Sequence, residues 1–160
     1  MNTYNYNFKL FFVVIALLGL GGCAARQEIT QLTDYVPQKV CIAKNDAVRE
    51  GVIKALEKGF AKHNVDTMVV NATYVEKHGA LTPSISDDQS KNCETLVFYT
   101  ANWHWDLAMY MRFANVWLMD ESMQAKLAQA TYTAGAGLDK FIDAEEKIIE
   151  LVDEMFKQKT

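Results

Sequence analysis

An apolar run near the start of the chain most strongly constrains what the rest can fold into. Residues 10–20 (LFFVVIALLGL) follow a polar start whose single charge is Lys9, and they lead into Gly-Gly-Cys, ending at Cys23. The run has about 11 residues, the size of the apolar part of an export signal, whereas a membrane-spanning helix needs about 20. We therefore predict that residues 1–22 are a cleaved signal peptide and that the fold is built from the residues after it.

The residues that end this run predict attachment to a membrane. Leu-Gly-Gly-Cys is similar to the lipobox of bacterial lipoproteins, where cleavage leaves a diacylglycerol-modified cysteine, here Cys23. An ordinary secretory leader or a short membrane stub is the alternative, but secretory leaders prefer an Ala-x-Ala-like end. Two or more acyl chains, palmitate among them, would anchor the chain stably. Because Ala24 rather than Asp follows the cysteine, analogy with that class favours the inner leaflet of the outer membrane, facing the periplasm.

Charge and length limit the partners that the mature chain can have. Without Lys9, 15 of the 16 Lys and Arg remain against 20 Asp and Glu, a net charge near −5. This balance, with no basic cluster, argues against nucleic acid as a partner. The absence of a polybasic segment leaves membrane attachment to the acyl chains on Cys23. About 138 residues suit one domain, which we place at 39–160, after a lipidated, polar tether at 23–38.

Two further cysteines follow Cys23. Cys41 and Cys93 lie in or beside predicted strands. In an oxidising periplasm such a pair usually forms a disulfide, which would close a loop of about 50 residues. Two buried free thiols are the alternative.

The first half of the domain has a strand–helix–strand pattern. Residues 39–43 (KVCIA) are apolar and β-branched, and residues 66–75 (DTMVVNATYV) are strand-like. Between them, apolar residues recur at helical spacing, with Asn45 or Asp46 as the expected N-cap and Asn64 as a left-handed stop. Glycines within this helix, Gly51 and Gly59, would weaken it but allow close packing on a sheet. The order suggests a crossover between the strands without proving that they are parallel.

The second half reads as an antiparallel meander followed by a helix. Residues 76–92 are rich in Gly, Pro, Ser and Asp and predict a long irregular loop, either functional or merely mobile. Strands are expected from residue 93 to Trp103, over 105–118 and over 124–133. An apolar stripe that begins at Phe141 predicts the last helix.

These elements together predict the fold class α+β. The expected order is β-α-β-β-β-β-α, with two helices packed on one face of a mixed four- to five-stranded sheet.

Aromatic residues on the meander are the sharpest candidate for a binding surface. Tyr and Trp combine a large apolar area with a polar tip, which suits recognition of a partner. Cross-strand packing inside the sheet is the competing interpretation, and it is favoured for Trp117 and Phe113. The candidate partner surface comprises Tyr99, Trp103, Trp105 and Tyr110.

Other polar groups give little support for catalysis. His104 and Asp106 share a strand face, but no Ser or Cys nucleophile is spaced to join them. The segment Gly135–Gly137 could present N–H groups to an anion, although the fuller phosphate-binding motifs are absent. The three histidines lack metal-site spacing, so we predict no metal, no cofactor and no catalytic residue.

Three segments resemble a family of proteobacterial proteins, the Sbal-type lipoproteins. They are VCIAKNDAVREGV (40–52), NCETLVFYTANWHWDLAMYM (92–111) and GAGLDKFIDAEEKI (135–148), and the string from Tyr99 to Asp106 is fairly specific. The family has no established catalytic residues. At fold level the layout looks like small envelope lipoprotein domains such as LpoB or the TolB N-terminal module, an analogy that does not assign a function.

We therefore predict a lipid-anchored, non-enzymatic envelope module that binds a protein or glycan partner, with its oligomeric state open. The alternative is a periplasmic enzyme or small-ligand binder using the region near His104, Asp106 and the turn Gly135–Gly137. A structural lipoprotein without a specific ligand is a third possibility.

Overall fold

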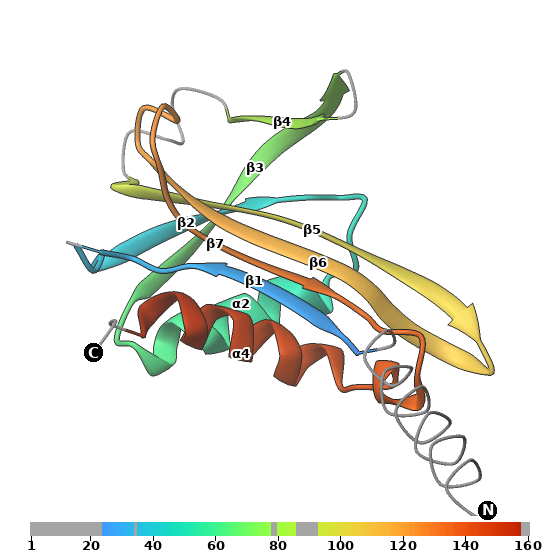
Figure 1. Cartoon of the computed structure of the whole chain (residues 1–160). Helices are drawn as coiled ribbons and strands as arrows, with labels where there is room; N and C mark the ends of the chain where they lie inside the picture. The colour runs from blue at the N-terminus through green and yellow to red at the C-terminus, as the bar shows by residue number, and fades with distance from the viewer. Residues whose placement is uncertain (1–23, 34, 78–79, 86–92, 158–160) are drawn as a thin grey trace, which may run out of the picture.

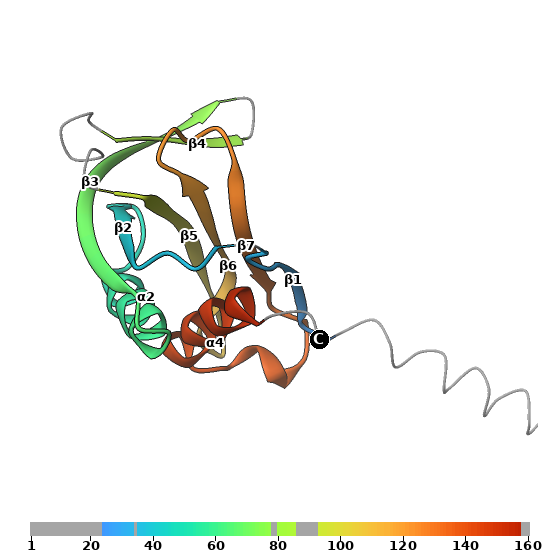
Figure 2. The same ribbon diagram turned by 90° about the vertical axis from the view of Figure 1, so that its left-hand side faces the viewer.

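The computed structural model describes residues 24–33, 35–77, 80–85 and 93–157, and it has one mixed seven-stranded sheet with two α-helices on one of its faces (Figures 1 and 2). The α+β class is as predicted, but the expected four to five strands understate the sheet. In chain order the elements are β1 (Arg26–Thr30), β2 (Lys39–Lys44), α2 (Gly51–Lys62), β3 (Asp66–Lys77), β4 (Ala80–Ile85), β5 (Thr95–Asp106), β6 (Ala108–Asp120), β7 (Lys126–Thr133), the 3₁₀ turn η2 (Leu138–Lys140) and α4 (Ala144–Phe156).

The strand order is β1-β7-β6-β5-β2-β3-β4. Strand β2 pairs in parallel with β3 on one side and with β5 on the other, while the remaining neighbours are antiparallel. Helix α2 is thus the crossover between two parallel strands. Asn64, just after this helix, has φ 57°, which confirms the expected left-handed stop.

Two strands arise from segments that the sequence pattern did not mark as strands. Residues 26–30, expected within the tether at 23–38, form β1 and pair antiparallel with the open edge of β7. Residues 80–85, expected within the irregular segment 76–92, form β4 and pair with β3. Both are edge strands, where polar residues and even Pro83 are tolerated because one side needs no hydrogen-bonded neighbour.

The larger core lies between the sheet and the two helices. Side chains on one face of β5, among them Val97 and Tyr99, are buried there, while Leu96 and Phe98 point to the opposite face, as the alternation predicts. The helices run in the same direction. Lys58 in the second half of α2 pairs with Glu145 in the first turn of α4 at 2.5 Å, whereas His63, just after α2, lies 2.9 Å from Asp153 near the end of α4.

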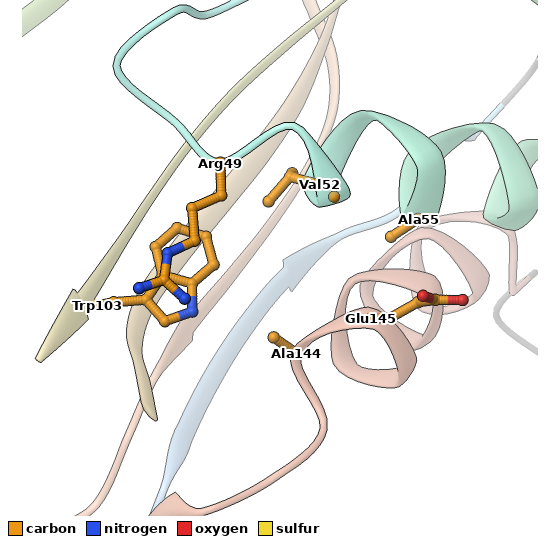
Figure 3. A pocket seen from close by; sticks show the side chains of 7 residues that line it. Arg49, Val52, Ala55, Trp103, Ala144 and Glu145 are labelled. Atoms are coloured by element: carbon orange, nitrogen blue, oxygen red, sulfur yellow. The ribbon is translucent and has the colours of Figure 1, made fainter. Parts of the chain in front are cut away.

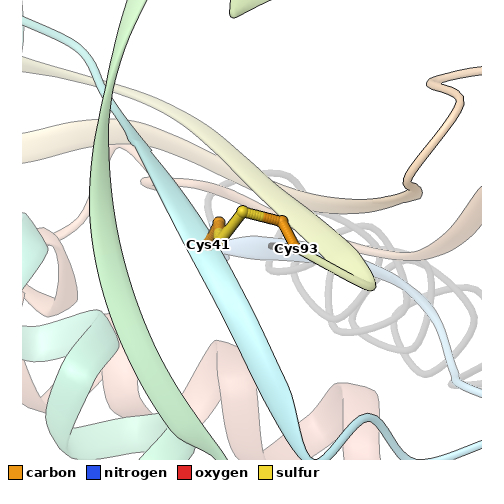
Figure 4. Close-up of a disulfide and its surroundings, with 2 residues drawn as sticks. All are labelled: Cys41 and Cys93. Carbon is orange, nitrogen blue, oxygen red and sulfur yellow. A yellow bond between two sulfur atoms is a disulfide. The ribbon is translucent and has the colours of Figure 1, made fainter. Parts of the chain in front are cut away.

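A second, smaller core lies on the other face of the sheet. It contains the disulfide between Cys41 and Cys93, whose Cα atoms are 5.6 Å apart (Figure 4). The predicted disulfide is therefore present. Phe98 and Trp117 pack beside it with their ring centroids 5.8 Å apart, so Trp117 has the packing role that the sequence favoured. The bent strand β3 and its partner β4 curve over this side (Figure 2).

Several predicted element ends differ from the structure. Helix α2 begins after Glu50 rather than at Asn45 or Asp46, because the Asn45 side chain is engaged elsewhere. Helix α4 begins after Asp143, whose carboxylate accepts from the Glu146 N–H.

The β5–β6 hairpin also turns later in the chain than expected. Trp105, expected to open the next strand, still belongs to β5, and the chain reverses at Leu107, which has φ 59°. Strand β7 begins at Lys126, two residues after its predicted start at Gln124.

The double substitution Cys41→Ala with Cys93→Ala removes a crosslink between residues 52 positions apart. Restoring the chain entropy of the unfolded state should lower the free energy of unfolding by about 4 kcal/mol, measured by urea denaturation. Dithiothreitol should destabilise the unsubstituted protein and leave the double variant unaffected. Equal urea midpoints for the two proteins would contradict a stabilising crosslink.

Gly59→Ala should destabilise the protein because Gly59 contacts α4, not the sheet as its spacing suggested. An added Cβ would lie 2.9 Å from the Val152 Cβ, and such overpacking lowers the free energy of unfolding by about 1–2 kcal/mol. Gly51→Ala is the matched control, since its Cβ would meet nothing within 4 Å and should raise that free energy by about 0.4–1 kcal/mol. The midpoints of thermal and of urea unfolding should therefore both fall in Gly59→Ala and both rise in Gly51→Ala. If both substitutions raised the midpoints, the gain in helix propensity would outweigh the clash with Val152, and the packing prediction would be wrong.

Candidate functional site

The long hairpin of β5 and β6 positions the aromatic residues singled out in the sequence. Up to Asn102 the two strands are in regular register, and a register shift between Asn102 and Trp103 then brings Trp103 opposite Met111. Beyond this bulge the hairpin extends away from the part of the sheet that the helices cover (Figure 1). Trp103 and Trp105 lie two residues apart on β5, yet their surroundings differ.

Trp103 is partly buried and lines a pocket of about 260 Å³. The guanidinium carbon of Arg49 lies 4.6 Å from the centroid of its ring (Figure 3). The remaining lining comes from the N-terminal parts of the two helices: Gly51, Val52, Ala55, Ala144 and Glu145. Because the helices are parallel, both of their positive N-terminal ends lie beside this pocket.

The Trp103 pocket therefore combines three recognition elements. The indole offers a flat apolar face, the guanidinium stacks on it and presents a planar set of donors, and small apolar side chains form the wall. The pocket lining contains Glu145 as its one acidic group, and that carboxylate is paired with Lys58. Such a site can hold a partner group by stacking and hydrogen bonding, but it offers no free nucleophile or base.

Tyr99 does not belong to the candidate partner surface, because it is 1% exposed and part of the main core. Its hydroxyl accepts from the Asn45 N–H at 3.1 Å, and its carbonyl accepts from the Asn45 side-chain amide at 3.1 Å. Burial raises the pKa of Tyr99. The residue thus closes the loop between β2 and α2, a structural role that the sequence pattern alone does not reveal.

Tyr110 is also removed from the candidate surface, since it is buried beneath η2. Its ring meets Phe141 edge-on with centroids 5.6 Å apart, and the Lys140 ammonium lies 5.2 Å from its centroid. Of the four predicted residues, Trp103 and Trp105 alone reach the surface, and Trp105 is 69% exposed.

A second, open pocket joins His104 and Asp106 to the glycine turn that precedes η2. It has a volume of about 540 Å³, and its lining includes Gly135 and Lys140. Lys140 forms an ion pair with Asp106, and this hydrogen bond raises the pKa of Lys140. The structure does bring these predicted residues together, but Asp106 is already partnered and no Ser or Cys lines the pocket.

Metal chemistry gains no support from the part of the chain that the structure describes. Within those residues, no group of three or more His, Cys, Asp and Glu side chains could hold a metal ion. His63 lies beside Asp153 and stacks on Phe156, with ring centroids 4.3 Å apart.

Among the described helices, none is both long and apolar enough to cross a membrane. Cys23 and its predicted lipidation lie outside the described residues.

Sequence reasoning missed the contributions of Arg49 and Lys140. Arg49 precedes α2 by two residues, and nothing in its neighbours signals that it will stack on an indole more than 50 positions later. Lys140 is charged yet almost buried, which a single sequence cannot indicate. Both residues lie in the segments that lead into the helices, so both contacts depend on where α2 and α4 begin relative to the β5–β6 hairpin.

Comparison with known proteins gives a fold likeness only. No protein-family model and no curated protein matches the chain. Among solved structures, the PelC dodecamer from Paraburkholderia phytofirmans matches with a TM-score of 0.53 and 11% identity, covering 84% of this chain and 99% of that chain. A second PelC dodecamer structure, of a variant, gives a TM-score of 0.52 at 10% identity, covering 82% of this chain and 93% of that chain.

A PDZ domain protein from Parabacteroides distasonis matches with a TM-score of 0.42 and 9% identity, covering 89% of this chain and 38% of that chain. Because the identity to PelC is so low, the likeness shows a shared fold and carries no residue role from PelC to this chain.

Proposed function

We propose that this protein is a lipid-anchored lipoprotein of the cell envelope that binds a protein or glycan partner and has no enzymatic activity. Acyl chains on Cys23 would attach it to the inner leaflet of the outer membrane, with the domain facing the periplasm. Two observations support export: the apolar run that ends in Gly-Gly-Cys, and the disulfide between Cys41 and Cys93, a bond typical of oxidising compartments.

The stacked pair of Arg49 and Trp103 is the observation that carries the binding proposal. An aromatic face can accept the apolar side of a sugar ring or a peptide side chain, while a guanidinium can hold a carboxylate in a bidentate arrangement. These two groups are also the side chains most enriched at protein interfaces. The pair lies at the mouth of a pocket of about 260 Å³, large enough for one side chain or part of one sugar ring.

Small-ligand binding in the pocket of about 540 Å³ is the second candidate function. That pocket joins His104, Asp106 and Gly135, the region of the alternative prediction. Its fixed charges suit a polar ligand, but the ion pair between Asp106 and Lys140 weighs against acid–base catalysis there. Self-association is a further outcome to test, because the PelC structures with the same fold are dodecamers.

Site-specific photo-crosslinking in living cells tests the partner proposal. A photoreactive residue in place of Gly51 would lie at the pocket without a clash, since an added Cβ there meets nothing within 4 Å. We expect it to capture a partner, and Trp103→Ala or Arg49→Ala to abolish that capture by removing the stacking pair. A photoreactive residue in place of Glu121, in the β6–β7 turn, should capture nothing.

Trp117→Phe is the matched aromatic control and should keep the capture, because Trp117 packs against Phe98 in the smaller core and does not line the Trp103 pocket. Mass spectrometry identifies the captured species, including a second copy of this chain. Each variant must retain its disulfide and its unfolding midpoint. Capture that persists in Trp103→Ala would overturn the binding surface.

If palmitate labelling is absent from the unsubstituted protein, or persists in Cys23→Ala, the anchoring proposal is wrong.

A further inference from the structure

The tip of the β5–β6 hairpin carries a cluster of exposed apolar side chains. Trp105 is 69% exposed, Leu107 is 80% exposed and Met109 is 51% exposed. Trp105 and Met109 are directly paired across the two strands, so they point to the same side, and Leu107 forms the turn between them. Leu138, in the adjacent turn η2, is 79% exposed. Exposed apolar groups gathered at one protruding end are typical of a contact with another apolar surface.

The start of the described chain lies toward the same end of the sheet. Arg26 on β1 pairs with Thr133 on β7, which pairs with Phe113 on β6, which in turn pairs with Asn102 on β5. The hairpin tip lies beyond Asn102, and the residues before Arg26 lead toward that end because β1 runs away from it (Figure 1). Whatever precedes β1 is therefore attached on the hairpin side of the domain.

The distances along the chain fit a shared contact with one bilayer. From Asn102 to Leu107 the strand advances by about 17 Å. Cys23 is three residues before Arg26 and can reach at most about 11 Å toward the same end. The remaining difference is about 6 Å, within the depth of roughly 5–10 Å to which interfacial apolar groups enter a membrane.

The charges on the hairpin tip itself are compatible with this placement. Asp106 is the one acidic residue between Asn102 and Arg112, and it is paired with Lys140. This segment of the hairpin therefore brings no unpaired carboxylate to the lipid, where an isolated charge is costly. Asp139 lies beside Leu138 in η2, outside the segment that we place in the bilayer. Trp is also the side chain most suited to the boundary between headgroups and acyl chains, because its ring is apolar and its N–H is polar.

We infer that the tip of the β5–β6 hairpin, through Trp105, Leu107 and Met109, inserts into the headgroup region of the bilayer to which the chain is anchored. This inference rests on the proposed anchoring at Cys23. It adds a second attachment point, so the domain has a fixed orientation on the membrane instead of swinging on its N-terminal residues.

Fluorescence quenching by brominated lipid tests the insertion. The purified acylated protein is bound to vesicles of phosphatidylethanolamine and phosphatidylglycerol, with or without acyl-brominated phosphatidylcholine. We expect brominated vesicles to quench part of the tryptophan emission of the unsubstituted protein. Trp105→Phe should lose this quenching, and Leu107→Asp should reduce it. Trp117→Phe is the matched control and should keep it, because Trp117 is buried against Phe98 on the sheet.

Flotation of the same samples separates the two proposals. Protein that floats with the vesicles and carries acylated Cys23, but shows equal emission on plain and brominated vesicles, would overturn the insertion and leave the anchoring intact. Protein that neither floats nor carries acyl groups would overturn the anchoring. Quenching that persists in Trp105→Phe, or chemical crosslinks between copies that Leu107→Asp abolishes, would also overturn the insertion.

Discussion

The burial of strand β2 on both of its faces is the constraint on which the rest of the structure depends. Residues 40–43 are fully buried, and the strand has parallel neighbours on both sides. Val40 and Ile42 face the two helices, whereas Cys41 and Ala43 face the smaller core. Both faces of the sheet must therefore be covered at this position. The helices cover one face, and the curved β3–β4 pair with the disulfide covers the other.

This cover ends before the β5–β6 hairpin does, which leaves two candidate contact surfaces on the molecule. At the boundary, Trp103 is held between the main core and Arg49, where the first turns of both helices leave a pocket. Trp105 lies two residues further along β5, where the helices no longer cover the strand, and it is largely exposed. The same alternation of side chains thus yields the Trp103 pocket and an exposed apolar tip. Their difference arises from where α2 and α4 begin relative to β5, not from the strand itself.

Sequence reasoning succeeded where burial leaves a periodic pattern. The helix before Asn64, the alternation along β5 and the α+β class all follow from apolar spacing, and the structure has each of them. It failed at β1 and β4, because edge strands exposed on much of their surface need no apolar alternation. It also placed Tyr99 on the surface, although Asn45 and the main core enclose that ring. An aromatic side chain looks the same in a sequence whether its neighbours cover it or not.

The sequence by itself determined the local features: an apolar run that leads into Gly-Gly-Cys at Cys23, a cysteine pair suited to a disulfide, and the helical and strand periods. These features depend on the order of residues and on side-chain spacing within one element, so they can be identified from the amino-acid sequence alone. Only the tertiary structure decided that Cys41 and Cys93 meet, that Arg49 stacks on Trp103, and that Trp105 is exposed. Each of these depends on which distant elements lie side by side and where one of them stops covering another.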